Sequence, residues 1–143
     1  MSKSFKVLGL AVSALALTQL PAAAQTKITN EGISATEIVI GTHQDLSGPI
    51  KVWGVPVSNG MKMAVEEINA AGGINGRKIN FISYDDGYSP PKTVEQVRKL
   101  VESDEVLAVF QPLGTPPNTA IQKYMNAKKV PQLFVATGAT KWG

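Results

Sequence analysis

Two short segments in the second half of the sequence carry residues suited to holding a small ligand. The first, Leu113-Gly114-Thr115-Pro116-Pro117-Asn118, lies between an apolar run and an amphipathic stretch. We expect Thr115 to cap a helix that has Pro116 in its first position, and a helix N-terminus attracts anions such as a carboxylate. Because Pro116 and Pro117 have no N–H, the remaining donors are the Gly114 or Thr115 N–H and the Thr115 hydroxyl.

The second segment is Val135-Ala136-Thr137-Gly138-Ala139-Thr140, which combines small side chains with two hydroxyls. Small residues let a ligand approach the main chain, so the segment could bind the ammonium and carboxylate groups of an α-amino acid. A polar loop without a ligand is the alternative. Trp53, which follows an earlier apolar run, could form a wall of the same pocket or could simply be packed.

Other polar residues offer weaker chemistry. Asp85 and Asp86 provide only two ligands for a hard cation, so we expect loop-shaping hydrogen bonds and no metal site. His43 is the only histidine, the chain has no cysteine for it to activate, and Ser47 lacks the strand-turn-helix context of a nucleophilic serine. We therefore expect His43 to pack or to line the ligand site, and we expect neither a catalytic residue nor a cofactor.

Alternating strands and helices must position these residues. Short β-rich runs at 37–42, 78–84, 106–110 and 132–136 are typical of buried parallel strands. Apolar residues at helical spacing separate them: Val57, Met61, Ala64, Val65 and Ile68, then Val94, Val97, Leu100 and Val101, then Ala120, Ile121, Tyr124 and Met125.

This alternation predicts an α/β fold with a parallel sheet of order 2-1-3-4 and helices on both faces. The chain then reverses direction between the first and third strands. A crevice should open at the carboxyl ends of these strands, bordered by loops 44–54 and 111–118.

Turn residues mark the first strand-helix-strand unit clearly. Ser47-Gly48-Pro49 follows the first strand, and Gly72-Gly73 and Asn75-Gly76 supply a helix end and a tight turn before the second. Together with Ile38–Gly41 and Met63–Ile79, these residues resemble the opening of the branched-chain amino-acid (Leu/Ile/Val-type) periplasmic substrate-binding proteins of ABC transporters. The similarity runs from about Glu37 to the last residue.

The resemblance implies the N-terminal lobe of a type I periplasmic binding protein. In that family the loops after the third and fourth strands hold the head group of the amino acid, and an aromatic residue of the first loop lies against the ligand. The matching ligand-binding positions here are Trp53, Gly114, Thr115, Thr137, Gly138 and Ala139. The Pro116-Pro117 pair and the Gly138-Ala139 step differ from a standard Leu/Ile/Val binder, so the ligand is expected to be an amino acid or a related small amide.

The N-terminus indicates export. Lys3 and Lys6 precede an apolar run at 7–17 and small residues up to Ala24, which is typical of a cleavable signal peptide over residues 1–24. The run is too short for stable membrane insertion, and without cysteine no lipid anchor can form. We expect a soluble periplasmic protein with a polar segment at 25–36 and a binding lobe at 37–143, truncated so that the second lobe is absent.

Charge and function follow from this organisation. Without the leader, 12 basic residues face 11 acidic residues, and a net charge of +1 gives no reason to expect nucleic acid as a partner. The leading interpretation is a non-enzymatic binding protein that delivers its ligand to a membrane permease, with weak binding by a lone lobe. A flavodoxin-like or receiver-like domain and an exported hydrolase using His43 are the alternatives.

Overall fold

The computed structural model describes residues 32–142. The expected signal peptide at 1–24 and most of the polar segment at 25–36 lie outside the described residues. The elements, in chain order, are β1 (Glu37–Gln44), α1 (Lys51–Ala70), β2 (Lys78–Asp85), α2 (Pro90–Glu102), β3 (Ala108–Phe110), α3 (Thr115–Lys128), β4 (Gln132–Leu133) and a 3₁₀ turn (Thr140–Trp142).

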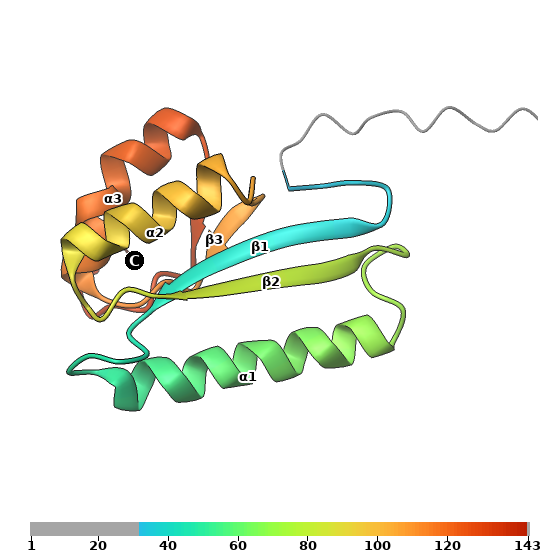
Figure 1. Ribbon diagram of the computed structural model, residues 1–143, viewed down its shortest axis with the longest axis horizontal. Helices are drawn as coiled ribbons and strands as arrows, with labels where there is room; N and C mark the ends of the chain where they lie inside the picture. Colours follow the sequence, from blue (N-terminus) through green and yellow to red (C-terminus); the bar gives the residue numbers. More distant parts are fainter. Residues whose placement is uncertain (1–31, 143) are drawn as a thin grey trace, which may run out of the picture.

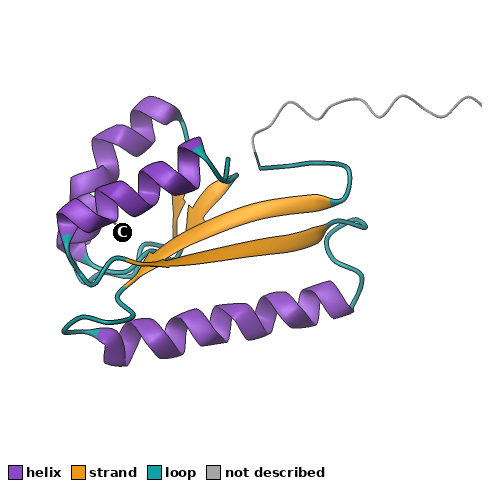
Figure 2. Ribbon diagram, viewed as in Figure 1, coloured by secondary structure: helices purple, strands orange, loops and turns teal. Residues whose placement is uncertain are grey.

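The four strands form one parallel sheet in the order β2-β1-β3-β4. Helix α1 covers one face, and α2 and α3 lie together on the other (Figure 1). Figure 2 shows the sheet between these two layers of helix. The predicted α/β class, strand order and two-sided helical cover are confirmed.

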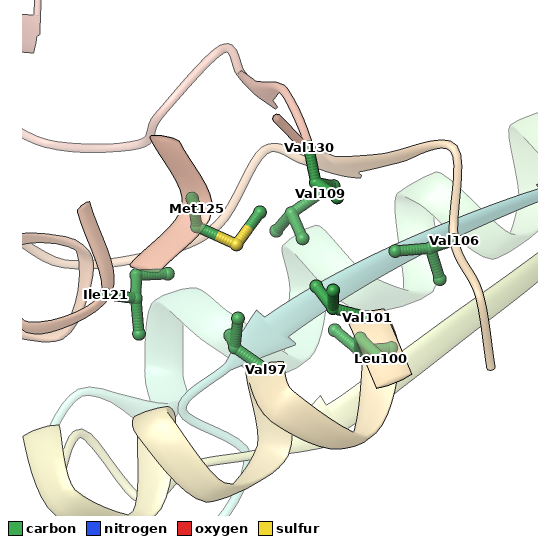
Figure 3. Close-up of a cluster of buried hydrophobic side chains, with 8 residues drawn as sticks. All are labelled: Val97, Leu100, Val101, Val106, Val109, Ile121, Met125 and Val130. Carbon is green, nitrogen blue, oxygen red and sulfur yellow. The ribbon is translucent and has the colours of Figure 1, made fainter. Parts of the chain in front are cut away.

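The apolar core lies between the sheet and the α2–α3 layer (Figure 3). Gly41 permits this packing, because a Cβ at that position would lie 2.7 Å from Cδ2 of Leu100. The core consists of Val97, Leu100, Val101, Val106, Val109, Ile121, Met125 and Val130. The helical periodicity of α2 and α3 predicts most of this set.

The buried stripe of helix α1 includes Met61, as its periodicity predicts, but otherwise differs from the predicted one. The buried residues are Gly54, Ser58 and Met61. A Cβ on Gly54 would lie 2.0 Å from the Asp45 carbonyl oxygen, so the glycine permits a close approach that turns its own face of the helix inward. Val57 and Val65, which were also expected to face the sheet, are only half-buried. The prediction is wrong for Ala64 and Ile68, because both side chains are exposed.

The later strands are shorter than expected. Strand β3 begins at Ala108 instead of residue 106, and β4 ends at Leu133 instead of residue 136. Phe134 adopts a φ of +54°, which interrupts the extended conformation. Parallel pairing resumes as a single bridge between Leu113 and Ala136, so the chain after β4 still lies beside the chain after β3.

Candidate functional site

The loop after β3 enters α3 with a glycine at the cap position. Gly114 is the N-cap residue and has a φ of +102°, and Thr115 is the first residue of the helix. The prediction that Thr115 caps the helix is therefore wrong. As a cap, the Thr115 hydroxyl would need the N–H of Asn118, because Pro117 has none, and the Asn118 N–H donates instead to the Gly114 carbonyl at 3.1 Å.

Instead, the Thr115 hydroxyl faces the loop after β4. Its Oγ1 lies 2.5 Å from Oγ1 of Thr137. Main-chain bonds hold the two loops together: the Gly114 N–H donates to the Ala136 carbonyl at 3.0 Å, and the Ala136 N–H donates to the Pro112 carbonyl at 2.9 Å. The strand order thus places two hydroxyls from neighbouring loops at one point of the carboxyl edge.

The other expected site residues are less closely joined. Ala139 donates its N–H to Oγ1 of Thr137 at 3.1 Å, so it belongs to the same cluster. Gly138 is exposed, and nothing lies within 4 Å of the position its Cβ would take. Its main chain is therefore open to a ligand on that side.

The sequence predicts that Trp53 lies in the loop after the first strand, and this is wrong, because Trp53 is the third residue of α1. Helix α1 starts at Lys51 because the Asp45 carboxylate accepts the N–H groups of Gly48 and Ile50 and closes the preceding loop early. The indole is 68% exposed and follows β1 at the carboxyl edge. Within residues 32–142 it makes no hydrogen bond through its side chain and no ring contact with another aromatic residue, so the structure joins it to the hydroxyl cluster only by its position on this edge.

A buried polar network lies directly beneath the cluster. His43 Nδ1 is 2.8 Å from Oδ2 of Asp86, and its Nε2 is 3.2 Å from Oδ1 of Asn118. The Asn118 amide in turn donates to the carbonyls of Gly114 at 2.7 Å and Pro112 at 3.2 Å. This network connects the end of β1 to the loop that carries Thr115.

Asn118 did not stand out in the sequence, although a signal was present. It precedes Ile121 and Met125 by three and seven positions, so it lies on the apolar face of α3. A polar side chain on such a face needs buried partners. His43 packs as expected, and its ring is fully buried.

Asp85 shapes the loop after β1, in agreement with the expected role of the two aspartates. Its carboxylate accepts the N–H groups of Leu46 and Gly87, both at 2.9 Å, and the Ser47 hydroxyl at 2.6 Å. Burial alone would raise the pKa of Asp85, but these three donors and the Lys92 charge lower the pKa to about 2. Nowhere in residues 32–142 do three or more histidine, aspartate or glutamate side chains gather closely enough to hold a metal ion.

Comparison with known proteins identifies the family. The family model described as periplasmic binding protein matches residues 37–143. The chain belongs to the periplasmic binding protein family. The resemblance noted in the sequence is therefore confirmed over the predicted range, and the sheet carrying the hydroxyl cluster belongs to a type I periplasmic-binding-protein lobe.

Individual relatives agree with the family match. The chain is 36% identical over 72 residues to the leucine-specific-binding protein of Salmonella typhimurium, which covers 50% of this chain and 20% of that protein. The branched-chain amino acid transporter substrate-binding protein LivJ of Streptococcus pneumoniae, solved with isoleucine, superimposes with a TM-score of 0.68 at 29% identity. That match covers 73% of this chain and 30% of LivJ.

A third relative is named for a different ligand. The fatty acid ABC transporter substrate-binding protein of Thermomonospora curvata superimposes with a TM-score of 0.64 at 29% identity, covering 71% of this chain and 26% of that one. This periplasmic binding protein thus spans less than a third of the length of each of these relatives. In residues 32–142 no helix is both long enough and apolar enough to cross a membrane.

Proposed function

We propose that this periplasmic binding protein is part of the solute-binding component of an ABC transporter and captures an amino acid of the branched-chain type, or a related small amide. The ligand is released to a membrane permease and no bond is broken. A relative named for leucine binding and a branched-chain amino acid transporter protein solved with isoleucine support this over a flavodoxin-like, receiver-like or hydrolytic function.

One observation carries the proposal: the hydroxyls of Thr115 and Thr137 meet at the carboxyl edge, beside the N-terminus of α3. One of the two hydroxyls donates to the other, so the second hydroxyl can donate to a ligand oxygen. The positive end of the α3 dipole favours a carboxylate at the same point. The exposed main chain at Gly138 offers a further polar contact.

A carboxylate is common to an amino acid and a fatty acid, so the site alone does not separate them. The mostly polar character of the Thr115–Thr137 cluster and the nearby main-chain groups favours a small ligand with a second polar group, such as the α-ammonium of an amino acid. Trp53, exposed on the same edge, would contact the side chain of the ligand.

The remaining features belong to the same proposal. Residues 1–24 serve as a cleavable signal peptide, residues 25–36 as a polar connection, and residues 37–143 as lobe sequence. The leader directs the protein to the periplasm, where the ligand and the permease are encountered. In such proteins a second lobe closes over the ligand by a hinge motion. Residues 37–143 would supply the half of the ligand contacts that comes from the first lobe.

Backbone NMR of the ¹⁵N-labelled chain tests the proposal, because shift changes report weak as well as tight binding. Isoleucine should move the amide signals of Gly114, Thr115 and residues 137–139, and isoleucinamide, which has an amide in place of the carboxylate, tests the small-amide alternative at the same signals. Octanoate probes the fatty-acid alternative. If octanoate but not isoleucine shifts these signals, the ligand class is wrong; if neither does, or if the shifts occur elsewhere, the site is wrong.

A further inference from the structure

Both ring nitrogens of His43 face groups that accept hydrogen bonds. Nδ1 faces the Asp86 carboxylate at 2.8 Å, and Nε2 faces the Asn118 side-chain oxygen at 3.2 Å. The imidazole is fully buried, so water cannot serve either nitrogen. A neutral imidazole has only one N–H and would leave one nitrogen lone pair pointing at an oxygen.

The orientation of Asn118 follows from its other contacts. Its Nδ2 lies 2.7 Å from the Gly114 carbonyl and 3.2 Å from the Pro112 carbonyl, and both of these oxygens can only accept. Exchanging Oδ1 and Nδ2 would place an amide oxygen 2.7 Å from a carbonyl oxygen. The atom that faces His43 is therefore the oxygen, which also accepts the Gln132 amide at 2.9 Å.

We infer that His43 carries a proton on each ring nitrogen and, as an imidazolium, positions the Pro112–Thr115 loop through Asn118. The first half of this inference stands on hydrogen-bond geometry alone. The second half rests on the proposed function, because the loop that is positioned is the one that carries the ligand-binding hydroxyl.

The counter-charge is the Asp86 carboxylate. Besides His43, it accepts the Tyr88 N–H at 2.8 Å and the Thr93 hydroxyl at 2.8 Å. Donors of this kind stabilise the ionised form of a carboxylate, so the proton between the two residues belongs to the ring and not to Asp86. A buried charge must be paired in this way, because an unpaired one would be strongly destabilising.

Asp86 is the charged group that faces the ring from the elements packed around it. Helix α2 contributes the Thr93 hydroxyl, α3 the Asn118 amide, and β4 the Gln132 amide, which are all neutral. On β2, Tyr84 pairs in register with His43, but its hydroxyl donates to Asp104 at 2.9 Å, away from the imidazole.

Loss of one proton would break the network in a defined place. If Nε2 lost its hydrogen, its lone pair would repel Oδ1 of Asn118. Asn118 could recover the contact only by turning over, and its bonds to the Gly114 and Pro112 carbonyls would then be lost. The loop carrying Thr115 is thereby tied to the protonation of a histidine on a different strand.

The protonation state can be measured directly, because His43 is the only histidine in the chain. A long-range ¹H–¹⁵N correlation spectrum of the ¹⁵N-labelled chain gives one set of ring signals. At about pH 8, where a free imidazole is neutral, both ring nitrogens should show the shifts of N–H groups. One pyridine-type nitrogen at that pH would overturn the inference.

The positioning role is tested by raising the pH from about 6 to about 9.5. Any pH-dependent step in the chemical shifts of the ring nitrogens should be matched by a step in the amide shifts of Gly114 and Thr115. The amide shift of Gly60, which lies in open space on α1, should show no step. If the ring keeps both protons throughout, those amides should stay constant. A shift change in the ring without one in these amides, or in these amides without one in the ring, would refute the positioning role of His43.

His43→Gln supplies the matched control, since its amide can donate to Asn118 but does not titrate. In this variant the Gly114 and Thr115 amides should show no step over the same range, and a persistent step would refute the role of His43. With isoleucine present, affinity should fall about fivefold across the step of the unmodified chain. If isoleucine binds at no pH, the proposed function fails while the ring measurement still decides the protonation state.

Discussion

Two hydroxyls 2.5 Å apart hold two protons between them, and the bond joining them uses only one. The second proton needs another acceptor, and the pair is located where β3 and β4 both end. Neither threonine is exposed, so water has limited access to that proton. At the residue scale, the proposed function assigns this unused donor to a ligand oxygen.

Thr115→Val should therefore weaken the binding of isoleucine. A valine keeps the shape of threonine but removes one hydroxyl, at a cost of about 1 kcal/mol, or about fivefold in affinity. Titration followed by NMR or calorimetry measures the effect. Thr115→Ser, which retains the hydroxyl, should preserve most of the affinity.

Thr36→Val is the matched control, since Thr36 is exposed before β1 at the opposite edge of the sheet. It should bind like the unmodified chain. If Thr115→Val also bound normally, the hydroxyl pair would have no part in the site.

A second residue-scale prediction concerns Asp85, whose pKa of about 2 lies below its ordinary value of 3.8. Burial opposes this shift, but the bonds from Ser47, Leu46 and Gly87 outweigh it. Because the folded pKa is the lower one, the ionised carboxylate stabilises the fold fully above about pH 4, and this contribution disappears as the pH falls toward 2. Allowing for its partial exposure, the contribution is about 1–2 kcal/mol.

Urea unfolding of the unmodified chain and of Asp85→Asn between about pH 6 and pH 2.5 measures this contribution. The difference in unfolding free energy should be largest at the upper end and should shrink with acidification. Glu66→Gln, an exposed change on α1, should show no such trend. A difference that is constant with pH would mean that the Asp85 charge does not stabilise the loop.

The sequence predicted part of the arrangement of these residues for identifiable reasons. Gly114, Thr115 and Thr137 follow strands, so their convergence could be expected from strand order alone. The helix start was misjudged because Thr115 before a proline looks like a cap, whereas the helix begins one residue earlier, with Gly114 at the cap position. The partner of Thr115 and the role of Asn118 depend on side-chain directions across 22 and 75 positions of sequence, which no local pattern contains.

At the element scale, α1 is placed by one glycine and not by its apolar periodicity. Gly54 lies against the main chain of Asp45, whereas Gly60, six positions later, faces open space. A side chain is thus excluded at Gly54 and has free space at Gly60.

Gly54→Ala and Gly60→Ala should accordingly change stability in opposite directions. The first would force the helix away from Asp45 and should cost about 2–3 kcal/mol. The second removes the flexibility of an interior helical glycine and should stabilise by about 0.5–1 kcal/mol. Urea unfolding of both variants gives the comparison, and equal effects would contradict the close approach seen at Gly54.

Element type and order were predictable because strand and helix periodicities differ sharply and because glycine and proline mark their ends. Element length was less predictable in the later strands. Phe134 belongs to a β-rich run, yet its positive φ ends β4 after two residues. The local sequence favours a longer strand, so this conformation could not be predicted from it.

At the scale of the whole molecule, the two faces of the sheet are unequally covered. All eight residues of the buried core lie on the α2–α3 side. On the other side Met61 is the only large apolar side chain of α1 that is buried, and Val52, Trp53 and Met63 of the same helix are more than 60% exposed. The free energy holding α1 in place should therefore be well below that of global unfolding.

Hydrogen–deuterium exchange followed by mass spectrometry should show this inequality. Peptides from α2, α3, β1 and β3 should exchange slowest and at a common rate, because their amides open only when the shared core is lost. Peptides from α1 should exchange faster, through undocking of that helix alone. Equal protection of α1 and α2 would show that one cooperative unit spans both faces.

Two core substitutions separate local from global opening. Met61→Ala removes the principal apolar contact of α1 and should speed exchange in α1 while leaving α2 and α3 nearly unchanged. Val97→Ala, in the fully buried core, should lower protection in every element, since it destabilises the whole domain by about 2 kcal/mol. If Met61→Ala accelerated α2 as much as α1, the helix would be part of the main cooperative unit. Trp53, carried by α1, could then not move independently of the Thr115–Thr137 pair.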